Sequence, residues 1–87
     1  MELKYIIDKH GNFALFSPVN AHNDMARGFY EKPISAGFCK LERGTNGGNT
    51  QAHLIFVRCY GKSTSLGLDS RKEDGGIITK KLNNLYD

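Results

Sequence analysis

Residues 51–68 read QAHLIFVRCYGKSTSLGL and form the densest run of β-forming residues in the chain. From residue 52 to residue 60, apolar side chains fall on both sides of an extended chain, which predicts a strand at the centre of a sheet. Gly61 and Lys62 then allow a tight turn into a second strand over residues 63–68. We therefore expect a hairpin in the middle of the fold.

The tetrapeptide Gly61-Lys62-Ser63-Thr64 matches the end of the phosphate-binding loop Gly-x-x-x-x-Gly-Lys-Ser/Thr. Phe56 stands where the first glycine of that loop belongs, and the residues after Lys62 alternate like a strand instead of opening a helix. The loop binds phosphate through backbone amides at a helix N-terminus. We therefore interpret this segment as a hairpin turn and not as a nucleotide site.

The sequence before this hairpin predicts strands over residues 3–7, 13–16 and 34–41 and a helix over residues 18–28. A turn at residues 8–12 separates the first two strands. Ser17 and Pro18 are typical of a helix start, and Gly28 is suited to its end. Gly37 indicates a bulge or a close backbone approach within its strand. Residues 43–50 contain no apolar side chain and predict an exposed hairpin loop.

A second helix is predicted at the C-terminal end. Ser70 and Glu73 have the spacing of a capping box, which places the helix start there. The alternative is a start at Gly76 with Asp74 as the cap. Because each glycine costs about 1 kcal/mol relative to alanine inside a helix, Gly75 and Gly76 suggest that another backbone approaches the helix closely.

The predicted order is strand, strand, helix, strand, strand, strand, helix. This order indicates an α+β fold with a mainly antiparallel sheet of about five strands and two helices packed on one face. The chain has 87 residues, of which 39% are hydrophobic and 24% charged, as expected for one compact domain over residues 1–87. No apolar run reaches the ~18 residues of a membrane helix. The first eight residues lack the features of a signal peptide, so we expect a cytoplasmic protein without a membrane partner.

Signatures of catalysis or metal binding are weak. Cys39 and Cys59 lie in apolar, strand-like runs, and we interpret them as buried free thiols. A reaction that combined one of them with His53 would also need an orienting group and a cleft. The three histidines are scattered, no Cys-x-x-Cys occurs, and no Gly-x-Ser-x-Gly elbow is present. We therefore expect no enzyme activity, no metal and no cofactor.

Strand phase predicts one mixed surface. If Phe38, Phe56 and Tyr60 share a sheet face, then Lys40, Arg58 and Lys62 share it with them. Rings that alternate with cations are typical of surfaces that bind single-stranded nucleic acid. The alternative is that the rings form the core and the long basic side chains cover its edge. The net charge of +3 is compatible with both.

Residues 18–86 read helix, three strands, helix, an order that is similar to the double-stranded-RNA-binding domain family. That family carries basic residues at the start of its last helix, where this chain has Arg71 and Lys72. Glu73, Asp74 and the two glycines that follow replace the further lysine and the alanines of the family pattern. The resemblance is therefore one of element order, and it implies a nucleic-acid role for the two basic residues.

Together these observations favour a small, non-enzymatic regulatory module that acts by contact with a protein partner. The candidate partner-binding residues lie in the 43–50 loop and the following strand: Arg43, Asn46, Asn49 and Phe56. The alternative is nucleic-acid binding through a basic and aromatic sheet face and the start of the last helix: Lys40, Arg58, Tyr60, Lys62, Arg71 and Lys72.

Overall fold

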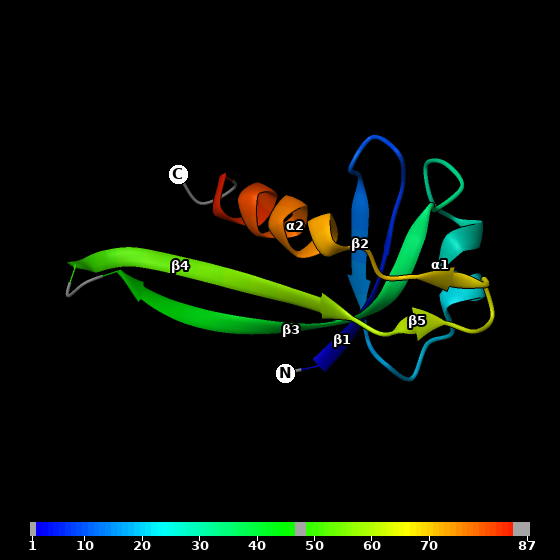
Figure 1. Ribbon diagram of the computed structural model, residues 1–87, viewed down its shortest axis with the longest axis horizontal. Helices are drawn as coiled ribbons and strands as arrows, with labels where there is room; N and C mark the ends of the chain where they lie inside the picture. Colours follow the sequence, from blue (N-terminus) through cyan, green and yellow to red (C-terminus); the bar gives the residue numbers. More distant parts are fainter. Residues whose placement is uncertain (1, 47–48, 85–87) are drawn as a thin grey trace.

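Four antiparallel strands form the main sheet, in the order β2-β1-β3-β4 (Figure 1). The computed structural model describes residues 2–46 and 49–84, and for residues 44–46 and 49–54 it describes the backbone alone. The elements in chain order are β1 Glu2–Ile7, β2 Phe13–Phe16, α1 His22–Arg27, β3 Ser35–Asn46, β4 Asn49–Tyr60, β5 Lys62–Ser63, β6 Leu68–Asp69 and α2 Lys72–Asn84. This architecture confirms the predicted α+β class with a mainly antiparallel sheet.

The first hairpin, β1–β2, turns at the predicted residues 8–12. The buried carboxylate of Asp8 accepts hydrogen bonds from the backbone N–H groups of His10 and Asn12, both at 2.9 Å. Gly11 adopts a φ of 83°, which a residue without a Cβ reaches at little steric cost. Burial alone would raise the pKa of Asp8, but the hydrogen bonds from Asn12 and His10 outweigh it and lower that pKa. An ionised acceptor therefore holds the turn.

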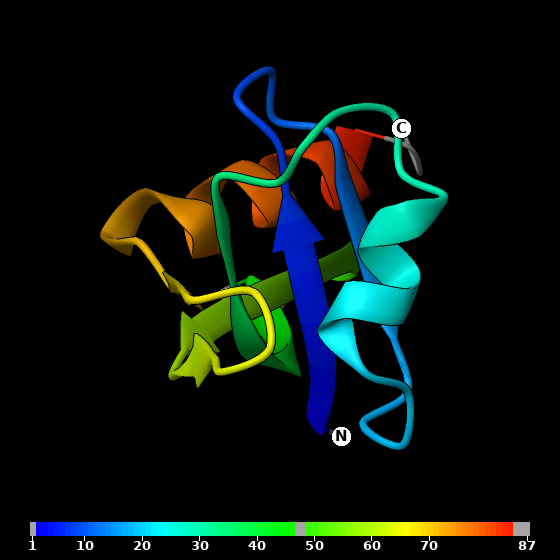
Figure 2. The ribbon, with the colours of Figure 1, turned by 90° about the vertical axis from the view of Figure 1, so that its right-hand side faces the viewer.

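The two helices cover opposite faces of the sheet (Figures 1 and 2). Successive strand residues point to opposite faces, and Tyr5 and Ile7 of β1 share one buried cluster with Ile78 of α2. Ile6, which lies between them, belongs to a second cluster covered by α1 and by residues 66–68. This differs from the predicted arrangement with both helices on one face. Because β1 is apolar on both faces, each face needs a cover.

β4 is an edge strand and not the predicted centre of the sheet, which β1 and β3 occupy. Its apolar residues on both faces have another cause. Val57 packs in the cluster beneath α2, whereas Phe56, on the other face, is 49% exposed. The apolar residues of β4 therefore do not indicate burial on both faces: one face packs beneath α2, and the other is exposed.

One stripe of α2, formed by Gly75, Thr79 and Asn83, covers the outer edge of β4. The Val57 N–H donates to Thr79 Oγ1 at 2.8 Å. Asn83 exchanges two hydrogen bonds with the backbone of Ile55, both at 3.1 Å. Residues four apart share one side of a helix, so this stripe satisfies polar groups that an edge strand otherwise offers to another chain.

The predicted boundaries of α1 are correct at one end. The helix begins at His22 and not at Pro18, because the Asn20 N–H first closes a turn onto the Ser17 carbonyl at 3.0 Å. It ends at Arg27, and the predicted Gly28 is its C-cap.

Two segments on either side of β4 differ from their predicted secondary structure. The strand expected over residues 63–68 is instead a ribbon of β5 and β6 around a turn in which Gly67 has a φ of 65°. The loop expected over residues 43–50 is largely replaced by strand, because β3 runs to Asn46 and β4 starts at Asn49. Gly37 shows the predicted close approach, since a Cβ there would lie 2.6 Å from the Tyr60 carbonyl oxygen.

α2 begins one residue later than the predicted capping box indicates. The Arg71 N–H donates to the Asp74 carboxylate at 2.9 Å, so the contact joins these residues and not Ser70 and Glu73. The spacing of three residues is the one expected for a cap. The alternative start at Gly76 is wrong. Among the described residues, neither helix is long and apolar enough to cross a membrane.

Candidate functional site

One face of the β3–β4 hairpin, opposite α2, carries exposed aromatic and charged side chains. Three directly opposed residue pairs form this surface, which we call the open face: Phe38 with Tyr60, Lys40 with Arg58, and Glu42 with Phe56. Residues two apart in a strand share a face, so all six project on the same side. The Phe38 and Tyr60 rings are half-buried. The other four side chains are exposed. The predicted coincidence of rings and cations is therefore found here for Lys40 and Arg58, but not for Lys62.

Phe38 and Tyr60 form the aromatic part of the open face. Their rings are stacked, with centroids 6.1 Å apart and planes inclined by 22°. The Lys40 ammonium lies 6.0 Å from the Tyr60 centroid, and the Lys4 ammonium of β1 lies 6.0 Å from the Phe38 centroid. A cation over a ring is attracted to its negative face. The protein's own lysines therefore already lie over both rings.

Carboxylates are interspersed with these cations. Glu42 lies 3.9 Å from the Arg58 guanidinium, and because the side chains are 52% and 73% exposed, this pair contributes at most about 1 kcal/mol. The Tyr60 hydroxyl donates to the carboxylate of Glu2 in β1, and this hydrogen bond raises the pKa of Tyr60 to about 12. The surface thus presents both signs of charge around its rings.

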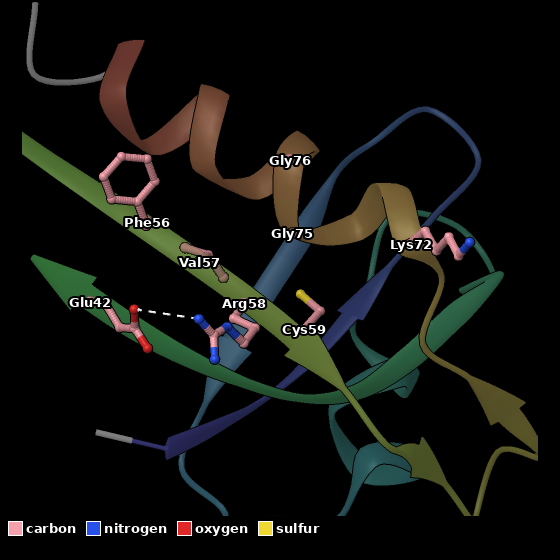
Figure 3. Close-up of a pocket in the computed structure, with 8 residues that line it drawn as sticks. All are labelled: Glu42, Phe56, Val57, Arg58, Cys59, Lys72, Gly75 and Gly76. Carbon is pink, nitrogen blue, oxygen red and sulfur yellow. Dashed lines mark ion pairs between the residues drawn. The ribbon is translucent and has the colours of Figure 1, made fainter. Parts of the chain in front are cut away.

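A groove of about 360 Å³ runs along the outer edge of β4, between the open face and the first turns of α2 (Figure 3). Phe56 and Arg58 line it from the open face, and Lys72 and Gly75 line it from α2. Cys59 lies between the two sides. Cys59, which is partly exposed, is therefore the cysteine that borders this groove.

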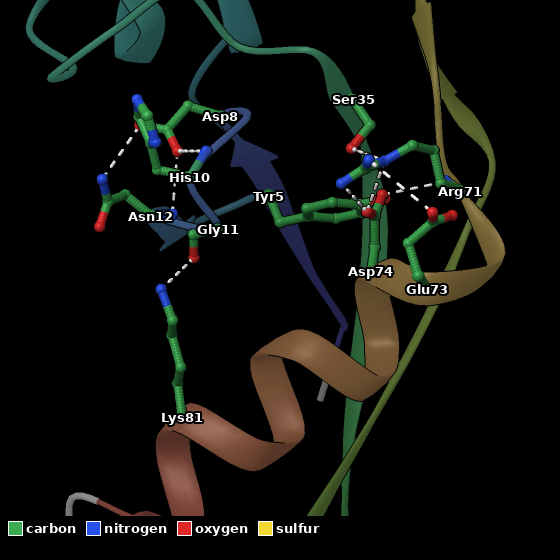
Figure 4. Close-up of polar contacts among 10 residues, drawn as sticks. All are labelled: Tyr5, Asp8, His10, Gly11, Asn12, Ser35, Arg71, Glu73, Asp74 and Lys81. Carbon is green, nitrogen blue, oxygen red and sulfur yellow. Dashed lines mark hydrogen bonds and ion pairs between the residues drawn. The ribbon is translucent and has the colours of Figure 1, made fainter.

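A fully buried carboxylate belongs to a structural cluster under the start of α2 (Figure 4). Asp74 is fully buried, and Tyr5 donates its hydroxyl hydrogen to Oδ2 at 2.5 Å. The Arg71 guanidinium donates to Oδ1 at 2.8 and 2.9 Å, and its Nε also lies 3.1 Å from the Ser35 hydroxyl. Each carboxylate oxygen thus has protein donors. We assign the cluster to the attachment of α2 to the sheet.

The structure divides the residues predicted to contact nucleic acid. Lys40, Arg58 and Tyr60 lie together on the open face. Lys62 lies in β5, paired with Asp69 of β6. The other two lie at the start of α2, where the Arg71 guanidinium is held by the buried carboxylate and Lys72 lines the groove.

The residues predicted to contact a protein partner are also separated. Phe56 belongs to the open face, whereas Arg43 is paired with Ile55 on the other side of the hairpin. Asn46 and Asn49 oppose each other across the two strands, and their side chains lie outside the described part of the structure.

Sequence reasoning overlooked the acidic and β1 members of this surface. The position of Glu42, two residues after Lys40 in the same strand, follows from the strand period alone. Lys4 and Glu2 reach the surface only because β1 pairs with β3, placing Lys4 opposite Phe38 and Glu2 opposite Lys40. The sequence of neither strand alone reveals the register in which β1 and β3 pair.

No protein-family model, curated protein or solved structure matches the chain. Among the described residues, no group of three or more His, Cys, Asp and Glu side chains is arranged to hold a metal ion. The open face therefore has to be interpreted from its own chemistry.

Proposed function

We propose that the protein is a small, non-enzymatic binding module that docks a protein partner on the open face of the β3–β4 hairpin. The observation that carries this proposal is the half-exposed ring of Phe56 next to the exposed Arg58 guanidinium. Aromatic residues and arginine are the residue types that dominate binding energy in protein interfaces. Such a ring needs an apolar pocket on the partner, with an acidic group nearby for the guanidinium.

The covered edge of β4 favours docking through the face. An exposed strand edge recruits partners by adding a strand. Here Thr79 and Asn83 occupy the backbone groups of Val57 and Ile55 along that edge. Among the residues that the structure describes, none covers the open face beside Phe56 in this way, so side-chain contacts are the favoured mode of binding.

The mixed charge of the surface supports a protein more than a nucleic acid. Surfaces that bind phosphate carry clustered cations. Here Glu42 pairs with Arg58, and Glu2 accepts a hydrogen bond from the Tyr60 hydroxyl. Both carboxylates would repel a phosphate backbone. A protein surface with both charges and an apolar centre complements this pattern.

Nucleic-acid binding is the second candidate, favoured by the lysine ammonium groups over Phe38 and Tyr60. A titration with a generic single-stranded oligonucleotide at low and rising ionic strength tests it. Affinity that falls steeply with salt and is reduced by Arg58→Glu would favour this candidate over a protein partner. Undetectable affinity at low ionic strength would exclude it.

The protein-partner proposal is tested by affinity purification from the native host with three forms of the full chain. The first is the wild type, and the second is the open-face variant Phe56→Ala/Arg58→Glu. The third is a matched control, Tyr30→Ala/Lys80→Glu, which changes one exposed aromatic residue and one exposed cation away from the open face.

A protein that uses the open face should be retained by the wild type and the control and depleted about tenfold or more on the open-face variant, as expected for the loss of contacts worth ~1.4 kcal/mol or more. Direct titration of the recovered protein against the three forms then gives the affinities. Equal retention by all three forms would show that the open face is not the docking surface.

A further inference from the structure

Cys39 and Cys59 are direct partners in the β3–β4 register. The backbone groups of Ile55 and Val57 bond to α2 and so point away from β3. The direction of the backbone N–H and C=O groups repeats every second residue of a strand. The N–H and C=O groups of Cys59 therefore also point away from β3. The two cysteines therefore form a non-hydrogen-bonded pair, the type in which side chains of antiparallel strands come closest.

This pairing meets the distance requirement of a disulfide. Non-hydrogen-bonded partners have Cα atoms about 4.5 Å apart, inside the range of about 4.4 to 6.8 Å that disulfides span. Both side chains belong to the face beneath α2, since Cys39 lies in the buried cluster and Cys59 packs against it. We propose that Cys39 and Cys59 form a reversible intramolecular disulfide, which makes the base of the β3–β4 hairpin a redox-modifiable site.

The two thiols differ in access, which sets the order of the reaction. Cys39 is fully buried, whereas Cys59 is partly exposed and lines the groove beside Lys72 and Gly75 (Figure 3). A small disulfide such as oxidised glutathione can therefore meet Cys59 first. Cys39 is then placed to act as the resolving thiol.

The exchange with oxidised glutathione balances in two steps. Cys59 loses its proton, its thiolate attacks one glutathione sulfur, and one glutathione leaves as the thiolate, which gives a mixed disulfide. Cys39 then loses its proton and attacks the Cys59 sulfur, so that the second glutathione leaves. The two cysteines are oxidised by two electrons, and their two protons end on the two reduced glutathiones.

The surroundings of the thiols favour a slow exchange and a stable product. Burial is the main cause that raises the pKa of Cys39 to about 11, and the charge of Glu2 adds to it. Burial also raises the pKa of Cys59 to about 12, where the charges of Cys39 and Asp74 add to the effect and a hydrogen bond with Tyr5 partly opposes it. At neutral pH both are therefore thiols, and the attacking thiolate is scarce. Reduced forms with unstabilised thiolates give disulfides that resist reduction. The site is suited to a lasting change and not to rapid sensing.

The test equilibrates the purified full chain in glutathione buffers of rising oxidised fraction, followed by an acid quench, alkylation and mass spectrometry. We expect both thiols to disappear together, a mass loss of about 2 Da, and a cross-linked peptide that contains both cysteines. Dithiothreitol should restore both thiols. Because the bridge closes residues 39–59, the oxidised form should melt higher by on the order of 10 °C.

The variant Cys39→Ala removes the resolving thiol, so Cys59 should retain one glutathione and gain about 305 Da. Peptide mapping of the wild type gives the same information if this variant fails to fold. The proposal is overturned if the native wild type keeps two free thiols in buffers that oxidise the urea-unfolded chain. It is equally overturned if the mixed disulfide or a disulfide-linked dimer is the end product.

Discussion

Gly75 of α2 lies so close to Val57 of β4 that a Cβ on this glycine would come within 2.6 Å of the Val57 carbonyl oxygen. The atom it meets is backbone, which cannot move aside like the end of a side chain. For the adjacent Gly76, such a Cβ would meet no described atom within 4 Å apart from its chain neighbours and the backbone of its own helix. Gly75 therefore has no room for a side chain, whereas the neighbouring Gly76 does.

Alanine at these two positions should change stability in opposite directions. Gly76→Ala removes a flexible residue from a helix interior and should raise the free energy of unfolding by up to about 1 kcal/mol. Gly75→Ala gains the same helix preference but pushes α2 away from β4, with a net loss of about 1 to 3 kcal/mol. Urea unfolding of both variants measures the difference. If both substitutions stabilise the protein, α2 does not pack on the edge of β4 in this way.

The sequence indicated a close approach at these glycines but not which one makes it. Residues four apart share one side of a helix, so Gly75 joins Thr79 and Asn83 in a stripe that the sequence displays once the edge strand is known. The sequence also suggested that β4 is central, because apolar side chains on both faces are typical of buried strands. Strand order depends on the pairing of distant segments, which no local pattern records.

Thr79 and Asn83 should keep β4 from pairing with another chain. The double variant Thr79→Ala/Asn83→Ala frees the backbone groups of Val57 and Ile55 and should lower the free energy of unfolding by about 1 to 3 kcal/mol. It should also associate with itself more strongly, because a free strand edge is a template for pairing. Sedimentation velocity over a concentration series measures this, with Lys80→Ala as the exposed control on the same helix. Identical sedimentation of the variant and the control would contradict this role.

The hydrogen bond from Tyr5 to Asp74 should contribute to stability well beyond what an exposed tyrosine contributes. Tyr5→Phe leaves Asp74 Oδ2 with one donor fewer in a fully buried site, so we expect a loss of about 1 to 3 kcal/mol in the free energy of unfolding. Tyr30→Phe is the matched control, because Tyr30 is 83% exposed. Thermal or urea unfolding of the pair provides the comparison. A change in Tyr5→Phe no larger than that in the control would mean that solvent replaces the lost donor.

The open face could be predicted in part because strand alternation is a local property. The period of two placed Lys40, Arg58 and Tyr60 on one side correctly. It failed for Lys62, since Gly61 takes a φ of 77° and the chain leaves β4 at that corner. Arg71 was expected at a binding surface because it is basic. Its partner Asp74 lies only three residues away, but the burial of that carboxylate against Tyr5 of β1 depends on long-range packing.

His22 should make the stability of the protein depend on pH in the mildly acidic range. Its side chain is buried, its Nε2 lies 2.8 Å from the Gly37 carbonyl oxygen, and the rings of Phe16 and Phe38 meet it edge-on at 5.5 and 5.9 Å. Burial lowers the pKa of His22, the hydrogen bond to Gly37 partly opposes this, and the charge of Lys4 adds to the lowering.

A group with a lowered pKa binds fewer protons in the folded state than in the unfolded state. Its contribution to stability is therefore complete above the unfolded pKa of about 6.5 and is lost as the pH falls toward the lower folded value. Between pH 7 and pH 5 the free energy of unfolding should decrease, with a slope from this residue of at most about 1.4 kcal/mol per pH unit. Urea unfolding at several pH values measures the slope.

The variant His22→Gln keeps a donor for Gly37 but cannot titrate, so the slope between pH 7 and pH 5 should flatten. His10→Gln is the control, because the side chain of His10 is 58% exposed and its partner Glu31 lies at the surface as well. An NMR titration of the wild type should show the His22 ring signals shifting at lower pH than those of a free histidine. If the slope survives in His22→Gln, the pH dependence arises elsewhere, and α1 is not attached to the sheet through a neutral imidazole.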